Sequence, residues 1–239
     1  LDCLNHASVC ANVSIKLTQI GLSLDEALCM RNLKRILARA AQYKNFIRID
    51  MEDSSYTTNT ISLFRKAKKS DFQNVGIAIQ SYLYRSEADI VNLLKEETHF
   101  RLVKGAYKEP ASVAFPKKRD VDKNFDRLTK LMLDASAEKN FPVLSADGRT
   151  PPLPAIGTHD PQRIIFAKKY AEEIGLSKQA LEFQMLFGIR RDLQEMCLQE
   201  GYPVRIYVPY GTHWYPFYMR RLAERPANLL FFIGNYFKN

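Results

Sequence analysis

The feature that most constrains the fold of this chain is the regular alternation of short apolar, β-branched runs with longer segments of helical period. Parallel strands need helical crossovers of this kind, whereas antiparallel strands are joined by tight turns. Eight such units predict one α/β domain over residues 1–239, a closed (βα)8 barrel of the TIM type. The predicted strands are residues 13–17, 47–51, 76–80, 101–106, 153–158, 182–186, 204–208 and 229–233.

Local signals mark where several of the intervening helices begin. Ser23 and Glu26 have the spacing of a capping box, which predicts a helix start at this point. Asp160 followed by Pro161 predicts an N-cap with proline at the first helical position. Residues 108–124 are rich in proline and lysine, and we expect them to form a long loop.

Composition excludes several classes of protein. Apolar residues make up 46% of the chain, enough for a full core. The chain contains no run of 18 apolar residues, the length that a membrane-spanning helix needs. The four cysteines lack CxxC spacing, which predicts free thiols in the cytoplasm and no metal site. The net charge of +9 comes without a nucleic-acid motif, so we expect no nucleic-acid partner. This charge is compatible with peripheral contact at the anionic inner face of a membrane.

A helix predicted after the seventh strand, over residues 215–228, carries an unusual cluster of charges. Pro216 stands at its first position and Pro226 ends it. Two adjacent guanidiniums beside an aromatic ring and a carboxylate suit a carboxylate or phosphate ligand, although a solvated basic face is the alternative. The residues that share this face are Phe217, Arg220, Arg221 and Glu224.

Polar side chains are predicted to gather at the carboxyl ends of the strands, where the active site of such a barrel lies. So many long polar groups could not be buried without partners, so we expect a polar pocket above the barrel. Basic groups outnumber acids, which favours an anionic substrate or a phosphate-bearing cofactor, and Tyr107 and Tyr207 could wall a small aliphatic substrate. The residues at these ends are Lys16, Asp50, Gln80, Arg101, Lys104, Thr158, His159, Gln184, Arg205 and Tyr207.

Two further patterns bear on the chemistry. No GxGxxG follows a strand, which argues against a Rossmann nucleotide domain, and no HExxH or Cys–His cluster indicates zinc. His159 is the best candidate for a general base. A histidine directly after a strand is more often a structural or ligand-orienting donor, and both interpretations stay open.

Seven strings, in order along the chain, resemble the proline dehydrogenase family, particularly its single-function bacterial members. The resemblance implies a distorted (βα)8 barrel with the helix after the seventh strand lying over its C-terminal mouth. It also implies non-covalent FAD, oxidation of L-proline to Δ1-pyrroline-5-carboxylate, and transfer of electrons to a membrane quinone. The strings are VSIKLT at 13–18, IRIDME at 47–52, RLVKGAY at 101–107, GTHD at 157–160, EFQML at 182–186, RIY at 205–207 and RRLAE at 220–224.

The same resemblance assigns roles by position. Arg220 and Arg221 would clamp the substrate carboxylate, and Arg101 would approach the flavin near its hydride-accepting nitrogen. These three and Lys16 are the candidate catalytic residues. The other implied substrate contacts are Asp50, Tyr107, Leu186 and Tyr207. The residues implied to hold FAD are Gln80, Arg101, Val103, Gly105, Ala106, Thr158, His159, Gln184, Arg221 and Glu224.

The chain departs from the family pattern in two places. Phe217 stands where the family usually has tyrosine, three residues before the first arginine of the pair. The family also has a helical region before the first strand, of which almost none is present here, and Leu1 rather than methionine stands first. We therefore expect a fragment or a processed form.

Three alternatives to proline oxidation remain at this point. The same machinery could oxidise hydroxyproline, although the bulk of Tyr207 disfavours an added hydroxyl and we expect proline to be preferred. A (βα)8 aldolase could form a Schiff base on Lys16 or Lys104. A degenerate barrel without activity could bind an anionic metabolite.

Overall fold

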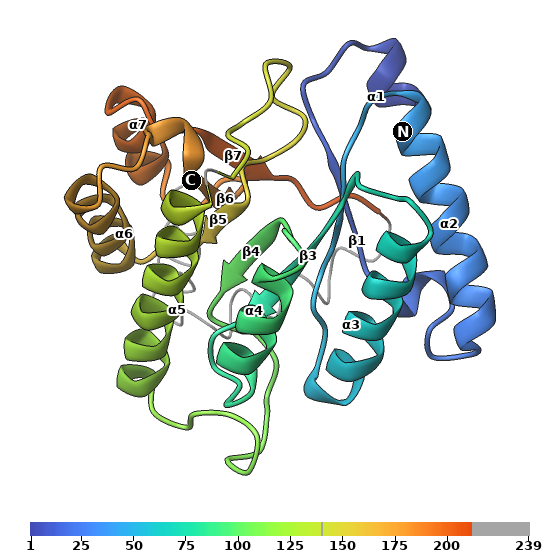
Figure 1. The fold of residues 1–239 in the computed structure, drawn as a ribbon, viewed down its shortest axis with the longest axis horizontal. Coiled ribbons are helices and arrows are strands. Elements are labelled where there is room, and N and C mark those ends of the chain that lie inside the picture. The colour runs from blue at the N-terminus through green and yellow to red at the C-terminus, as the bar shows by residue number, and fades with distance from the viewer. Residues whose placement is uncertain (140, 212–239) are drawn as a thin grey trace, which may run out of the picture.

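The computed structural model describes residues 1–139 and 141–211, in which seven parallel strands alternate with helices (Figure 1). Each strand pairs with its neighbour in sequence, in the order β1 to β7. The first seven predicted strands are thus confirmed, while the eighth, at 229–233, and the helix at 215–228 lie outside the described residues. The strands are β1 Val13–Ile15, β2 Ile47–Ile49, β3 Val75–Gln80, β4 Phe100–Val103, β5 Pro154–Gly157, β6 Glu182–Leu186 and β7 Val204–Tyr207.

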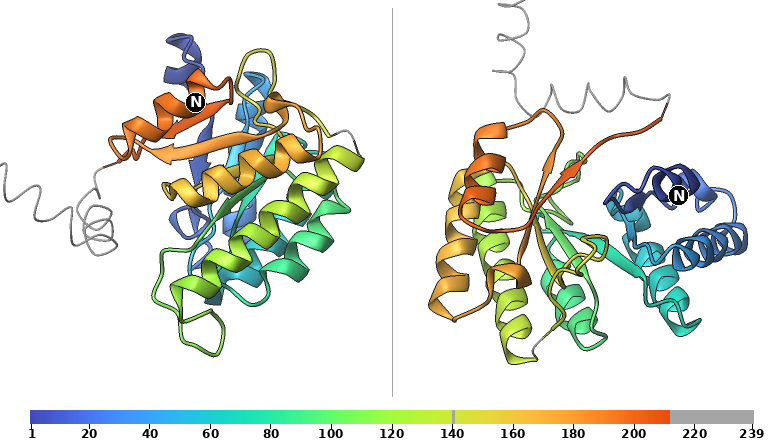
Figure 2. Two further views of the ribbon diagram at one scale, coloured as in Figure 1. Left: turned by 90° about the vertical axis from the view of Figure 1, so that its left-hand side faces the viewer. Right: turned by 90° about the horizontal axis from the view of Figure 1, so that it is seen from above.

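Helices connect the strands on the outer side of the sheet (Figure 2). The predicted N-cap at Asp160 is confirmed, since its carboxylate accepts the Gln162 N–H at 3.0 Å. The predicted capping box of Ser23 and Glu26 is wrong. The helix α2 begins at Glu26, and its N-cap is Asp25, whose carboxylate accepts the Leu28 N–H at 2.6 Å. The helices are α1 Asp2–His6, α2 Glu26–Gln42, α3 Ser54–Lys69, α4 Ser86–Leu94, α5 Lys118–Glu138, α6 Pro161–Glu173 and α7 Arg191–Gln199, with short 3-10 turns at Thr18–Ile20 and Lys178–Ala180.

The loop predicted over 108–124 is shorter than expected, because α5 already begins at Lys118. Lys118 and Asp122 form an ion pair one turn apart inside this helix. Such pairs at i and i+4 support a helix in the absence of other signals. The pattern of lysines thus belongs to the first turn of a helix and not to a loop.

The two faces of the sheet carry opposite kinds of side chain, because successive residues of a strand point to opposite sides. The outer face is apolar and packs against the helices; it includes Ile47, Ile49, Ile77, Ile79, Phe100, Leu102, Ile156, Phe183 and Met185, all buried. The alternate positions form an inner face with many polar groups: Ser14, Arg48, Gln80, Arg101, Glu182, Gln184, Arg205 and Tyr207.

The sheet curls so that inner-face side chains from distant strands meet. Tyr207 of β7 hydrogen-bonds to Asp50, which follows β2, at 2.9 Å, and Arg101 of β4 reaches Ser14 of β1 at 2.7 Å. Among the described strands, β1 and β7 are the edges of the sheet. These strands therefore form a curled half-barrel, and the part of the predicted closed barrel that would include an eighth strand lies outside the described residues.

A turn between α5 and β5 connects the two edges at their amino ends. The Arg205 guanidinium on β7 donates to the Gly148 carbonyl at 2.8 Å, and the Asn12 amide donates to the Arg149 carbonyl at 3.0 Å. Asn12 directly precedes β1. The turn thus holds the curl at the end of the sheet opposite the predicted site.

No helix within residues 1–139 and 141–211 is both long enough and apolar enough to cross a lipid bilayer.

Candidate active site

Asp50 is the centre of a polar cluster at the carboxyl ends of the strands. Its Oδ1 accepts from the Arg101 Nη1 at 2.6 Å, and its Oδ2 accepts from the Lys16 Nζ at 3.1 Å and the Tyr207 hydroxyl at 2.9 Å. Asp50 and Arg101 are each 7% exposed. The sequence placed all four residues at strand ends, and the structure brings them together.

The pKa values of this cluster follow from burial and charge. Burial by itself raises the pKa of Asp50, but the charges of Arg101 and Lys16 outweigh it, and the net pKa lies below its ordinary value. Burial lowers the pKa of Lys16, yet the Asp50 carboxylate more than offsets this and the net pKa is raised. Burial, with the Asp50 charge, raises the pKa of Tyr207 to about 12. Near neutral pH the cluster therefore holds a carboxylate, an ammonium and a neutral phenol.

Arg101 is held on three sides. Besides Asp50 and Ser14, its Nε donates to the Gln184 Oε1 at 2.5 Å. The Gln184 amide in turn donates from Nε2 to the Glu182 Oε1 at 2.5 Å. The guanidinium carbon of Arg101 lies 5.3 Å from the centre of the Tyr207 ring. The guanidinium is therefore fixed by contacts from four different strands or their ends.

Ser14 and Glu182 were missed by the sequence analysis, which named only residues at the strand ends. Each lies two positions before a named residue, Ser14 before Lys16 and Glu182 before Gln184. Residues two apart in a strand share a face. This spacing could have identified both as inner-face residues.

The residues expected to hold FAD are consistent with a bound group at the carboxyl ends of β3 to β6. Gln80 is 2% exposed, and its Oε1 has no hydrogen-bond partner among the residues that the structure describes. Gly105 has a φ of +118°, and a Cβ there would lie 2.4 Å from the Tyr82 ring. A Cβ at Gly157 would lie 2.9 Å from Val103. Close packing of the protein itself therefore requires glycine at these two positions, and the orphaned buried acceptor of Gln80 is the feature that fits a bound ligand.

His159 acts in the described structure as an acceptor and not as an available base. Its Nε2 accepts the backbone N–H of Leu186 at 2.8 Å, which joins the end of β5 to the end of β6. Thr158, just before it, accepts the Asp160 N–H at 3.1 Å through its hydroxyl. This geometry favours the structural and orienting interpretation of His159.

Lys104 lies outside the Asp50 cluster. Its Nζ donates to Asp160 at 2.6 Å and to Asp122, so it ties the end of β4 to α5 and to the start of α6. A lysine that forms a Schiff base needs a depressed pKa and a free lone pair. Lys104 is engaged by two carboxylates and the pKa of Lys16 is raised, so the aldolase alternative lacks a nucleophile among these two lysines.

The remaining predicted site residues have three kinds of position. Tyr107 and Leu186 are half-buried, in the loop after β4 and at the end of β6. Val103 and Gly105 are also half-buried and Ala106 is exposed. The predicted contacts Arg220, Arg221 and Glu224, and the departure at Phe217, all lie outside the described residues.

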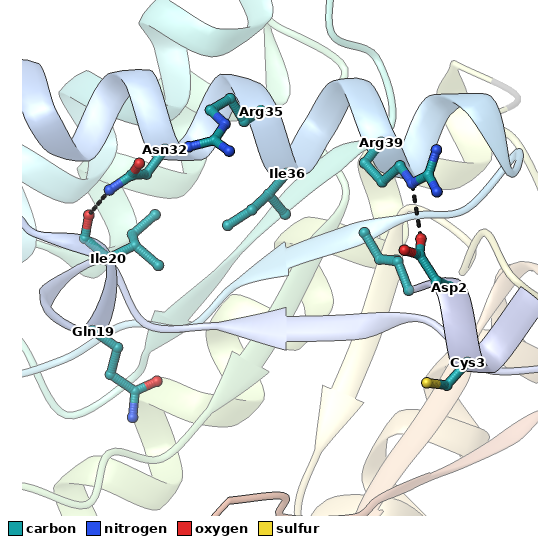
Figure 3. A pocket seen from close by; sticks show the side chains of 9 residues that line it. Asp2, Cys3, Gln19, Ile20, Asn32, Arg35, Ile36 and Arg39 are labelled. Atoms are coloured by element: carbon teal, nitrogen blue, oxygen red, sulfur yellow. Dashed lines mark hydrogen bonds and ion pairs between the residues drawn. The ribbon is translucent and has the colours of Figure 1, made fainter.

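A surface groove of about 760 Å³ lies between α1, the turn at Gln19 and Ile20, and α2 (Figure 3). Within it Arg39 pairs with Asp2 at 2.8 Å, and the Asn32 amide donates to the Ile20 carbonyl at 3.0 Å. None of the predicted site residues lines this groove. Within the described ranges no group of three or more His, Cys, Asp or Glu residues could hold a metal ion.

Parallel strands with helical crossovers, and charged groups converging beyond their carboxyl ends, define a barrel-type α/β enzyme. Comparison with known proteins gives the family. The family model described as Proline dehydrogenase matches residues 4–232. The chain therefore belongs to the proline dehydrogenase family.

Curated relatives and solved structures agree with this membership. Proline dehydrogenase 1 of Bacillus subtilis (strain 168) is 43% identical over 228 residues, which cover 95% of this chain and 70% of the relative. Proline dehydrogenase of Deinococcus radiodurans is 40% identical over 242 residues, covering 100% and 73%. Proline utilization A from Bdellovibrio bacteriovorus superposes with a TM-score of 0.74 at 26% identity, covering 88% of this chain and 24% of that protein. The chain thus spans about a quarter of that structure.

Proposed function

We propose that this chain oxidises L-proline to Δ1-pyrroline-5-carboxylate, the first step of proline catabolism, with bound FAD as the hydride acceptor and a membrane quinone as the next electron acceptor. Family membership supports the reaction. The observation that carries the proposal for the site is the cluster in which Asp50 binds Arg101, Lys16 and Tyr207 at the strand ends.

FAD, when bound, supplies the hydride acceptor, so the protein needs to supply only orientation and electrostatics. We propose that FAD lies over the ends of β3 to β6, where Gln80 offers an unpaired acceptor. The proposed cofactor contacts are Gln80, Arg101, Val103, Gly105, Ala106, Thr158, His159, Gln184, Arg221 and Glu224.

The substrate is proposed to be held by its carboxylate. Arg220 and Arg221 suit this role because two guanidiniums can bind a carboxylate in a fixed direction. Lys16 adds a cation at the mouth that is already partly neutralised by Asp50. Tyr107, Leu186 and Tyr207 are proposed to wall the ring.

The substrate nitrogen must lose its proton before hydride can leave the adjacent carbon. The lowered pKa of Asp50 makes it a weak base, and the raised pKa of Lys16 keeps this side chain protonated near neutral pH. Tyr207 is a neutral phenol whose pKa is raised to about 12. None of these three is suited to accept the proton, and we propose that water takes it.

A visible absorption spectrum of the purified protein tests this function. We expect a yellow chromophore that bleaches when L-proline is added without oxygen, and no bleaching with D-proline. A yellow protein that L-proline does not bleach would indicate the non-catalytic barrel, and a colourless protein that borohydride traps with a carbonyl substrate would indicate the aldolase.

Substrate choice and location extend the proposal. Tyr207 is held against Asp50, and its bulk leaves little room for a ring hydroxyl, so proline should be oxidised faster than hydroxyproline. Faster turnover of hydroxyproline would reject this preference.

We propose one barrel domain over residues 1–239, located in the cytoplasm and touching the inner face of the membrane where the quinone resides. The net charge of +9 and the free thiols of all four cysteines support that location.

A further inference from the structure

An unbroken chain of hydrogen bonds runs along the inner face from β7 to the mouth. The Arg205 guanidinium binds both oxygens of Glu182, with Nε to Oε1 at 2.9 Å and Nη2 to Oε2 at 2.8 Å. The Gln184 Nε2 donates to the Glu182 Oε1, and the Gln184 Oε1 accepts from the Arg101 Nε, both at 2.5 Å. Among the described residues, the hydrogen bonds that connect Glu182 to Arg101 run through the Gln184 amide.

An amide side chain has a donor end and an acceptor end, so its direction decides what it offers. An ionised Glu182 accepts hydrogen bonds and cannot donate them, which draws the Gln184 NH₂ toward itself. The Gln184 oxygen must then face the Arg101 Nε. With the amide reversed, an NH₂ would face a guanidinium N–H, and a buried donor would lose its partner.

Glu182 is otherwise difficult to explain as a stabilising residue. It is 1% exposed, and an apolar side chain in a sheet interior commonly stabilises at least as well as a buried ion pair. Its neighbours on the outer face, Leu181 and Phe183, are fully buried and apolar. The carboxylate therefore has a role that packing alone does not supply.

We infer that Glu182 is a positioning residue that fixes the direction of the Gln184 amide and, through it, the Arg101 guanidinium at the mouth of the half-barrel. This inference rests on the proposed function, in which Arg101 lies beside the reacting groups. Arg205 holds Glu182 in place and keeps a further contact, from Nη2 to the Gly148 carbonyl at 2.8 Å.

The experiment compares two variants. In Glu182→Gln the residue at 182 can donate as well as accept, so the direction of the Gln184 amide is no longer imposed. In the double variant E182Q/Q184E the charge moves to position 184, where the carboxylate accepts directly from Arg101 and the new amide donates to it. The hydrogen bond from Arg205 to the Gly148 carbonyl involves neither substituted side chain, and we expect it to persist in both variants. The net charge of the double variant equals that of the unmodified protein.

Two readouts are measured on each protein. We expect kcat/KM for L-proline to fall roughly tenfold in E182Q, the loss of one hydrogen bond to a charged group. The double variant is judged by the second readout, because Gln184 is itself a proposed cofactor contact. The ¹H–¹⁵N signal of the Arg101 Nε–H, assigned with Arg101→Lys, should shift and exchange faster with solvent in E182Q and recover in the double variant. Glu52→Gln is the matched control, because Glu52 is also buried and accepts twice, but from Thr18. It should leave the Arg101 Nε signal in place.

The outcomes separate this inference from the proposed function. An Arg101 Nε signal and a kcat/KM that do not change in E182Q would overturn the inference, as would a double variant in which the Arg101 Nε signal does not recover. If E182Q does not fold, the double variant decides alone by the same signal. A protein that does not oxidise proline would overturn the proposed function, while the Nε signal would still test the positioning role.

Discussion

The two faces of the sheet differ in the kind of side chain that they carry and in what those side chains contribute. The outer face buries aliphatic and aromatic side chains against the helices, and its residues contribute to the main core cluster. The inner face carries charges that satisfy one another across the curl. Because both faces belong to the same strands, alternate residues of a single five-residue strand such as β6 serve stability and chemistry in turn. The comparison teaches that substitutions one position apart should have different consequences.

The inner face is also unbalanced in charge. It carries the four cations Lys16, Arg48, Arg101 and Arg205 against the two carboxylates Asp50 and Glu182. Arg48 is 1% exposed and donates to the carbonyls of His99 at 2.5 Å and Ile77 at 3.4 Å. Burial, and then the charge of Arg101, lowers its pKa well below its ordinary value. A positive interior of this kind favours anionic ligands at the mouth.

The largest effect on stability is expected on the outer face, from Phe183→Ala. Phe183 is fully buried and packs edge-on against Tyr202, with ring centroids 5.5 Å apart. Removal of the ring should lower the free energy of unfolding by about 3–5 kcal/mol. Urea unfolding measures this loss. The KM for proline of the folded variant should stay near that of the unmodified protein, and a large rise in KM would show that the outer face also shapes the mouth.

The matching substitution on the inner side is Asp50→Asn, which keeps the shape and removes the charge that Arg101 and Lys16 share. We expect kcat/KM for proline to fall by a factor that corresponds to about 2–4 kcal/mol of activation free energy, because two buried cations lose their counter-ion. Steady-state kinetics measures the fall. Asp126→Asn is the control, because Asp126 on α5 is a partly buried carboxyl group paired with Arg163 at 2.8 Å and lies outside the Asp50 cluster. Equal losses in the two variants would contradict a special role for Asp50.

The pH dependence of stability sharpens the same contrast. The folded-state pKa of Asp50 is lowered, so its contribution is complete above the unfolded value of about 3.9 and is lost as the pH falls through the folded value. Acid unfolding of the unmodified protein should include this loss. Asp50→Asn should remove that part of the pH dependence, whereas Phe183→Ala should lower stability by a similar amount at every pH.

Local pattern was enough to predict the strands of the half-barrel and the polar residues at their ends. The first seven strands were recovered because each depends on alternation within a few residues. The role of Glu182 was not, since it depends on Arg205 and Gln184 meeting after the chain has curled. The helix start at Asp25 was missed because several polar residues nearby could each serve as a cap.

Tyr207→Phe should have the smallest effect, because it removes one hydroxyl and leaves the ring beside Arg101. The lost hydrogen bond to Asp50 should lower kcat/KM by a factor that corresponds to about 0.5–1.5 kcal/mol of activation free energy. The pKa of Tyr207 is raised to about 12, first by burial and then by the Asp50 charge. A raised folded-state pKa means that the stabilising contribution of the neutral phenol is complete below about pH 10 and is lost as the pH rises toward the folded value. Burial also raises the pKa of Tyr82, and a hydrogen bond to Asp134 raises that of Tyr170 to about 12. An ultraviolet titration of tyrosinate should therefore show several late-titrating tyrosines, with one fewer in Y207F than in the unmodified protein. A tyrosine count unchanged at that end of the titration would mean that the inner face does not hold this hydroxyl against the carboxylate, and the contrast between the two faces would be weaker at β7 than at β2 and β4.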